Sequence, residues 1–124
     1  MEKSTPTVLL AEDDATLAQM FKSYLTGEGF NVLETTDGEE TLKVLAVTPP
    51  QILLLDLMMP KMSGFDVLGA MRSDEKLKNI PVIVFSNLGQ EADIKKARDL
   101  GAKDYLIKAD ITPDKVVEVI KKYI

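Results

Sequence analysis

Short apolar runs alternate along the chain with segments that have helical periodicity. The apolar runs are Thr7–Ala11, Asn31–Thr35, Gln51–Asp56, Pro81–Ser86 and Asp104–Ile107. In three of these runs, four consecutive residues are all apolar, as in Ile52–Leu55, rather than alternating with polar residues. Strands of this kind are covered on both faces, as they are in a parallel sheet. The pattern therefore predicts five strands, at least three of them buried.

The first segment between the runs has the spacing of an amphipathic helix. Its apolar residues recur at helical spacing: Leu17, Met20, Phe21, Tyr24 and Leu25. We expect these side chains to form the face of the helix that packs on the core. Asp14 is the candidate N-cap, and Gly27 and Gly29 are expected to end the helix.

Three later helices have recognisable start signals. Asp37 and Glu40 have the spacing of an acidic capping box. Ser63 is a candidate N-cap of the next helix. Thr112-Pro113 opens the last helix, because the missing N–H of proline costs nothing in the first turn.

The remaining helix, Gln90–Leu100, is predicted to be weakly packed. Its apolar stripe consists only of Ile94, Ala97 and Leu100, among charged residues. Because a thin stripe buries little apolar surface, we expect this helix to be the least firmly docked of the five.

Strand and helix alternate five times, and this order predicts the fold class. Successive right-handed crossovers between parallel strands place helices on both faces of one sheet. We therefore predict an α/β fold with a doubly wound, five-stranded parallel sheet, a (βα)5 arrangement of the flavodoxin-like kind, as a single domain over residues 1–124.

Composition excludes several function classes. The chain has 124 residues, 45% apolar and 28% charged, with a formal charge of −5 that disfavours direct binding to nucleic acid or to an anionic membrane. It contains neither Cys nor His, which excludes catalytic triads, thiolate chemistry and imidazole–metal sites. The segment Met1–Ser4 is not followed by an apolar core, so we expect no secretory signal and a cytoplasmic location.

Polar residues follow the predicted strands at the edge where a parallel sheet carries its working site. They are Glu12 and Asp13 after the first strand, Asp56 after the third, Ser86 and Asn87 at the end of the fourth, and Lys108 after the fifth. An ionised Asp56 behind four apolar residues is costly unless it is paired or bound to a cation.

Three carboxylates converging on one edge repel one another, so either a proton is retained or a divalent cation neutralises them. Oxygen ligands without His or Cys favour Mg²⁺, or Mn²⁺, over zinc. Carboxylate, divalent cation, ammonium and hydroxyl together are the groups that position a phosphoryl group and neutralise its charge.

Other phosphate-binding motifs do not fit. Gly64 and Gly69 have the spacing of a P-loop, but Ala70-Met71 stands where Lys and Ser or Thr are needed. A flavodoxin-like flavin carrier would need a Ser/Thr/Gly-rich loop after the first strand, where Glu12, Asp13 and Asp14 would instead repel phosphate in the absence of a metal.

These residues resemble the receiver domain of two-component response regulators, of which the single-domain chemotaxis regulator is the simplest form. The resemblance covers essentially the whole chain. It implies that Asp56 is the phosphoacceptor, and that Asp13, Glu12 (through water), Asp56 and the main-chain carbonyl of Met58 hold Mg²⁺. It further implies that Ser86 and Lys108 contact the phosphoryl group, and that Ser86 and Tyr105 form the switch.

The resemblance also implies partners. A histidine kinase or histidine phosphotransfer protein would supply the phosphoryl group, and the fourth helix, fifth strand and fifth helix would face a downstream effector protein. Because the chain has no His, the donor histidine belongs to another protein. The chain would not be an enzyme beyond its own Mg²⁺-dependent phosphorylation and dephosphorylation.

Two residues depart from the family pattern. Ala109 stands where a proline, joined by a cis bond, usually follows the site lysine, and Asn87 stands where a small residue is usual. Asn87 either narrows the approach to Asp56 or donates a hydrogen bond to the phosphoryl group. A receiver that has lost its chemistry and serves as a constitutive interaction domain is the alternative that these departures support.

Overall fold

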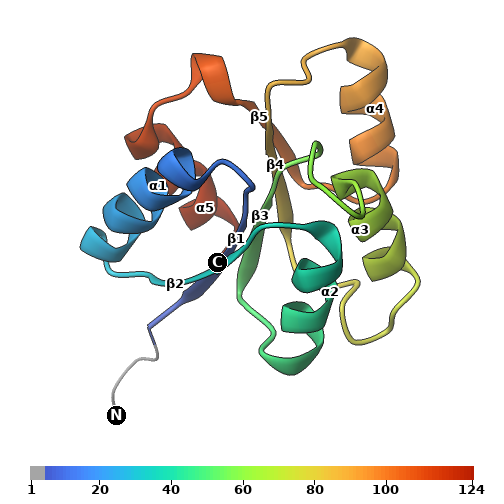
Figure 1. The fold of residues 1–124 in the computed structure, drawn as a ribbon, viewed down its shortest axis with the longest axis horizontal. Coiled ribbons are helices and arrows are strands. Elements are labelled where there is room, and N and C mark those ends of the chain that lie inside the picture. The colour runs from blue at the N-terminus through green and yellow to red at the C-terminus, as the bar shows by residue number, and fades with distance from the viewer. Residues whose placement is uncertain (1–4) are drawn as a thin grey trace.

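A single parallel sheet, in the order β2-β1-β3-β4-β5, runs through the middle of the molecule (Figure 1). The computed structural model describes residues 5–124, so Met1–Ser4, on which the expectation about a secretory signal rests, lies outside the described residues. The strands are β1 (Thr7–Ala11), β2 (Asn31–Thr35), β3 (Ile52–Leu55), β4 (Val82–Ser86) and β5 (Asp104–Ile107). The predicted doubly wound, five-stranded parallel sheet is confirmed.

Two of the strands are shorter than predicted. The run Gln51–Asp56 loses a residue at each end, and Pro81 lies outside β4. The N–H of Asp56 still donates to the carbonyl of Ala11 at 3.1 Å, but the Asp56 carboxylate accepts the N–H of Met58, which begins the turn after β3. The strand therefore ends one residue before its acidic side chain.

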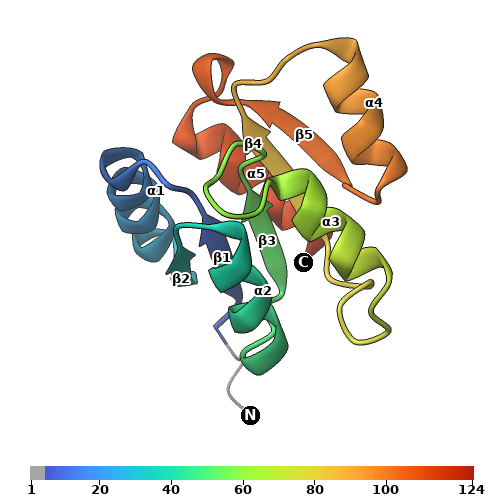
Figure 2. The same ribbon diagram turned by 45° about the vertical axis from the view of Figure 1, so that its right-hand side comes forward.

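Helices cover both faces of the sheet, as Figures 1 and 2 show. They are α1 (Ala15–Gly27), α2 (Gly38–Val47), α3 (Gly64–Arg72), α4 (Glu91–Asp99) and α5 (Pro113–Tyr123). One hydrophobic core lies under α1 and α5, and the other lies under α2, α3 and α4. Within residues 5–124, none of these helices is long and apolar enough to cross a membrane.

The predicted helix starts are confirmed, with one change of detail. Asp14 and Ser63 cap α1 and α3, accepting backbone N–H groups at 3.0 and 3.2 Å. Asp37 caps α2, but the Glu40 side chain accepts the N–H of Thr36 rather than that of the cap residue. The capping box predicted for α2 is therefore shifted by one residue.

The core-facing stripe of α1 is narrower than predicted. Ala18, Phe21 and Leu25 are buried, whereas Met20 is 47% and Tyr24 36% exposed. At roughly 100° per residue, Met20 lies well over a quarter-turn from the centre of the buried stripe. The expectation that Met20 and Tyr24 face the core is wrong. The helix α1 packs on the sheet mainly through Ala18, Phe21 and Leu25.

The start of α3 lies tightly against the end of β3. A Cβ added at Gly64 would lie 2.4 Å from the carbonyl oxygen of Asp56 and 2.7 Å from the Cα of Leu57. The N–H of Gly64 donates to the carbonyl of Leu57 at 3.0 Å. Only glycine allows this approach, which fixes the backbone directly after Asp56.

Candidate functional site

Three carboxylates meet at the carboxyl edge of the sheet. Oxygens of Glu12, Asp13 and Asp56 all lie within 4.8 Å of one another. The strands that deliver them, β1 and β3, are neighbours, and β2 lies on the other side of β1, so this is where the strand order reverses. Ligands bind at such a point in open α/β sheets. The predicted convergence of these three residues is present in the structure.

The three carboxylates differ in their exposure. Glu12 is 2% and Asp56 4% exposed, whereas Asp13 lies on the surface. The backbone N–H of Glu12 donates to the carbonyl of Thr35 at 3.0 Å, which continues the pairing of β1 with β2 by one residue. Glu12 and Asp56 are therefore held by sheet hydrogen bonds, and Asp13 is the most accessible oxygen ligand of the three.

Lys108 inserts its ammonium between the two buried carboxylates. Its Nζ lies 3.0 Å from Asp56 Oδ2 and also forms an ion pair with Glu12 Oε1. The side chain passes over the ring of Phe85, whose centroid is 5.5 Å from Nζ. When every group is ionised, this cluster still carries two net negative charges, which a divalent cation would balance.

Burial and pairing shift the pKa values of two members of the cluster. Burial raises the pKa of Glu12, and the negative charge of Asp56 acts in the same direction, against the bond from Lys108. For Lys108, burial acts to lower the pKa, but the hydrogen bonds and charges of Glu12 and Asp56 outweigh it and raise the pKa. The ammonium is therefore kept charged beside Asp56.

The oxygens of this cluster suit a hard cation. Glu12 Oε1 is buried and, within the described part of the chain, lacks a hydrogen bond of ordinary geometry, although the Lys108 ammonium contacts it. Glu12 Oε2 accepts the N–H of Asp14, and Asp56 Oδ1 accepts the N–H of Met58. Oxygen ligands with unsatisfied lone pairs match the preference of Mg²⁺ and Mn²⁺, so the residues present fit such an ion.

Ser86 and Asn87 lie at the end of β4, beside this cluster. Ser86 is completely buried, and its Oγ accepts the N–H of Leu88 at 3.3 Å. Asn87 is exposed, and its Oδ1 accepts the N–H of Ala109 at 3.1 Å. The Lys108–Ala109 peptide bond is trans. The carboxamide oxygen of Asn87 is thus engaged by the loop that carries Lys108.

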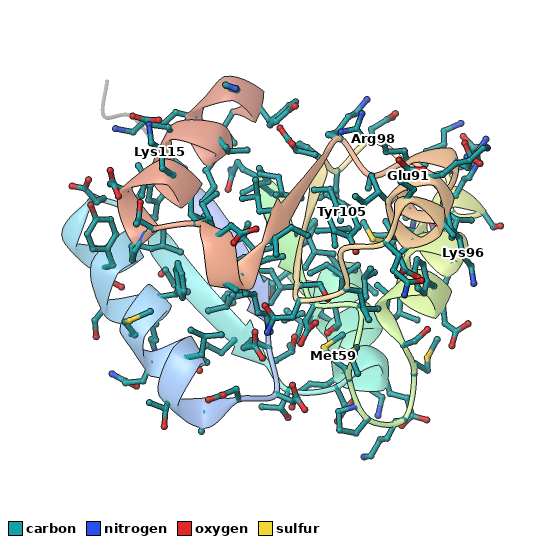
Figure 3. The ribbon with its side chains drawn as sticks, turned by 90° about the horizontal axis from the view of Figure 1, so that it is seen from above. Met59, Glu91, Lys96, Arg98, Tyr105 and Lys115 are labelled. Carbon is teal, nitrogen blue, oxygen red and sulfur yellow. The ribbon has the colours of Figure 1, made fainter. Side chains whose placement is uncertain are left out.

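Tyr105 connects β5 to the loop between β4 and α4. Its hydroxyl donates to the carbonyl of Leu88, and its ring packs in the core cluster that contains Ala97 of α4. Figure 3 shows Tyr105 between β5 and α4. Burial raises the pKa of Tyr105, and the charges of Asp93 and Asp56 add to this effect. The hydroxyl therefore remains a hydrogen-bond donor near neutral pH.

Sequence reasoning missed two contacts of the site. One is the ion pair between Lys108 and Glu12, and the other is the bond from Ala109 to Asn87. A signal for the second existed, because the two departures from the family pattern fall on loops that follow neighbouring strands. That the Asn87 side chain accepts the N–H of Ala109 could be seen only from the positions of the side chains in the structure.

Known proteins resemble the chain in sequence and in structure. The family model described as response regulator receiver domain matches residues 8–121. The DNA-binding dual master transcriptional regulator RpaA of Synechocystis is 35% identical over 103 residues, which cover 83% of this chain and 43% of that protein. The chain spans about half or less of the length of the curated relatives it matches.

Solved structures agree in fold along nearly the whole chain. A putative response regulator from Chloroflexus aurantiacus superimposes with a TM-score of 0.90 at 28% identity, covering 97% of this chain and 98% of that one. The phosphorylated cyanobacterial phytochrome response regulator RcpA gives a TM-score of 0.83 at 28% identity, covering 96% and 91%.

Proposed function

Because this chain belongs to the response regulator receiver family, we propose that it is a phosphorylation-controlled signalling switch with Asp56 as phosphoacceptor. The observation that carries this proposal is the cluster of Glu12, Asp13 and Asp56 oxygens, with Lys108 Nζ 3.0 Å from Asp56 Oδ2. We take residues 1–124 as one receiver domain that acts in the cytoplasm.

The acceptor step is a displacement at phosphorus. A carboxylate oxygen of Asp56 forms the new P–O bond, while the bond from phosphorus to the donor nitrogen breaks and its electron pair leaves with the donor imidazole. We take the donor to be a phosphohistidine of a histidine kinase or phosphotransfer protein, and because residues 1–124 contain no His, that histidine lies outside them. Apart from this step and the loss of the group by hydrolysis, we assign the chain no catalysis.

Two side chains would receive the new charge. The Lys108 ammonium already lies against Asp56 and can pair with a phosphoryl oxygen without crossing the site. The Ser86 hydroxyl can donate its proton to another phosphoryl oxygen while its Oγ continues to accept the N–H of Leu88. Both contacts become stronger as charge accumulates on the phosphoryl oxygens.

We assign the metal site to Asp13, Asp56 and the Met58 carbonyl, with Glu12 acting through water. Mg²⁺, or Mn²⁺ in its place, would neutralise the oxygens of the incoming phosphoryl group when bound. Asp13 is the exposed member of the set, and the backbone of Met58 already lies against Asp56.

The signal would leave the site through Ser86 and Tyr105. If Ser86 moves toward the phosphoryl group, Leu88 moves with it, and Leu88 holds the hydroxyl of Tyr105. Tyr105 lies against α4, so the surface of α4, β5 and α5 would change for a downstream effector protein. The negative net charge supports protein rather than nucleic acid or membrane as the direct partner of this domain.

Phosphorylation with a small-molecule donor tests the proposal. The protein is incubated with acetyl phosphate and Mg²⁺ and its intact mass is measured. We expect a gain of one phosphoryl group that is absent in Asp56→Asn and absent when the metal is chelated. Asp110→Asn, which alters an exposed carboxylate after Lys108, is the matched control and should be phosphorylated normally. An unchanged mass of the natural protein would contradict the proposal.

A further inference from the structure

Three consecutive residues at the end of β4, Ser86, Asn87 and Leu88, each accept or donate a hydrogen bond in the site. Ser86 Oγ accepts the N–H of Leu88, and the Leu88 carbonyl accepts the hydroxyl of Tyr105. Between them, Asn87 Oδ1 accepts the N–H of Ala109 at 3.1 Å. This third bond joins the loop of Ser86 to the loop of Lys108.

The bond depends on the chemistry of both residues. Ala109 has an N–H to donate, which a proline at this position would lack. Only the oxygen of the Asn87 carboxamide can accept it, so the side-chain orientation is determined by the bond. Ala109 lies in the 3-10 turn Lys108–Asp110, directly after the lysine that pairs with Asp56.

On the basis of the proposed function, we propose that Asn87 is a positioning residue that acts on Lys108 through Ala109, rather than a contact of the phosphoryl group. By holding the N–H of Ala109, Asn87 fixes the first turn after β5, from which the Lys108 side chain reaches back to Asp56. The ammonium is then oriented before the phosphoryl group arrives.

The same bond couples the two loops during the switch. Ser86 and Asn87 are adjacent, so a shift of Ser86 toward the phosphoryl group also displaces the acceptor of the Ala109 N–H. The loops that carry the hydroxyl and the ammonium therefore move together. Without the bond, each would respond separately.

A double-mutant cycle tests this coupling. The initial rate of phosphorylation by acetyl phosphate with Mg²⁺ is measured for the natural protein, Asn87→Ala, Ala109→Pro and the double variant. We expect Asn87→Ala to slow the reaction by about threefold to tenfold, the range set by the net contribution of one hydrogen bond. In the Ala109→Pro background, the same change should alter the rate by less than about 1.5-fold, because its partner is already gone.

The outcomes separate this proposal from the one on which it rests. If Asn87 contacts the phosphoryl group itself, its removal costs as much in the Ala109→Pro background as in the natural protein, and the positioning role is excluded. If the natural protein takes up no phosphoryl group, the proposed function fails before the cycle begins. Gln90→Ala is the matched control, since it shortens a carboxamide of the same loop that has no capping hydrogen bond, and its rate should be unchanged.

Amide hydrogen exchange of the unphosphorylated protein gives a second readout. Removal of the acceptor in Asn87→Ala should speed exchange of the Ala109 amide, while Gln90→Ala should leave it unchanged. Equal protection of the Ala109 amide in the natural protein and in Asn87→Ala would show that the bond does not hold the loop and would overturn the proposal.

Discussion

The helices α4 and α5 flank the same strand, β5, but are attached to the molecule in different ways. In α5, Val116, Val117 and Ile120 are buried, so a full apolar stripe docks the helix on the sheet. In α4, Ala97 is the one buried residue. Apolar packing therefore holds α5 over its length but holds α4 at one residue only.

Polar contacts supplement the thin apolar packing of α4. The Lys96 ammonium lies 4.3 Å from the centroid of the Phe65 ring on α3, and Arg72 donates to the carbonyl of Asp99. At the start of the helix, the Tyr105 hydroxyl holds the carbonyl of Leu88. Such contacts exchange with water at little cost, because each contributes far less than a buried aliphatic side chain.

If Asp56 is the phosphoacceptor as proposed, this difference would keep the site of the chemistry apart from the surface that reads it out. The buried carboxylates of Glu12 and Asp56 directly follow β1 and β3, and these strands are buried over Val8–Ala11 and Ile52–Leu55. The loop before α4 is linked to the site through Ser86 and Tyr105. Of the five helices, α4 buries the fewest residues, so it has the least apolar packing to hold it in place. On the proposed function, a change of charge at Asp56 would therefore displace α4 more readily than it would disturb the sheet.

The largest expected effect comes from truncating the same residue type in each helix. Ile120→Ala removes a completely buried side chain from α5 and should lower the free energy of unfolding by about 2–5 kcal/mol. Ile94→Ala removes a half-buried side chain from α4 and should cost about 1 kcal/mol. Urea unfolding of both variants measures the difference, and equal losses would contradict the contrast between the two helices.

A smaller effect is expected when the hydroxyl of Tyr105 is removed. Tyr105→Phe loses the bond to the Leu88 carbonyl and should cost about 1 kcal/mol, mainly by opening the loop before α4. Tyr123→Phe is the control, since that hydroxyl donates at 3.2 Å to Lys103 and Asp104 at the α5 side. Amide exchange should rise in α4 for Tyr105→Phe alone. The same rise in both variants would argue against a specific link.

The smallest effect concerns the contact between Lys96 and Phe65. Lys96→Met keeps most of the apolar stem but removes the charge, and it should cost about 0.5–1 kcal/mol, seen as faster exchange in α4. Lys95→Met, which breaks an ion pair to Asp99 within α4, is the matched control. If only the Lys95 variant loosens α4, attachment to α3 is not what holds the helix.

Most of the architecture was predictable from the pattern of residues. Completely apolar runs such as Ile52–Leu55 indicated the buried strands, and the motifs after them placed Glu12, Asp13, Asp56 and Lys108 at one edge. The family suggested by those residues is confirmed by the match over residues 8–121. The weak apolar stripe of Gln90–Leu100 also predicted the thin docking of α4, whose bounds are Glu91–Asp99.

What could not be predicted depends on three-dimensional side-chain geometry. Helical spacing includes Met20 and Tyr24 in the stripe of α1, but which of these residues the sheet covers depends on how the helix is rotated. The convergence of three carboxylates suggested that a retained proton or a divalent cation neutralises their charge. In the structure, the Lys108 ammonium also offsets part of this charge by pairing with Glu12 and Asp56. The roles of Asp56, Asp13, Glu12, Met58, Ser86 and Tyr105 in phosphorylation stay predictions.

The most direct test of the account compares amide exchange in α4 and α5 with and without phosphorylation. The natural protein and Asp56→Asn are each treated with acetyl phosphate and Mg²⁺, and exchange is followed in peptides that cover Glu91–Asp99 and Pro113–Tyr123. We predict that α4 changes its exchange several-fold in the phosphorylated protein, that α5 changes much less, and that Asp56→Asn shows neither change. A phosphorylated protein in which α4 is unaltered, or in which both helices change equally, would contradict the account.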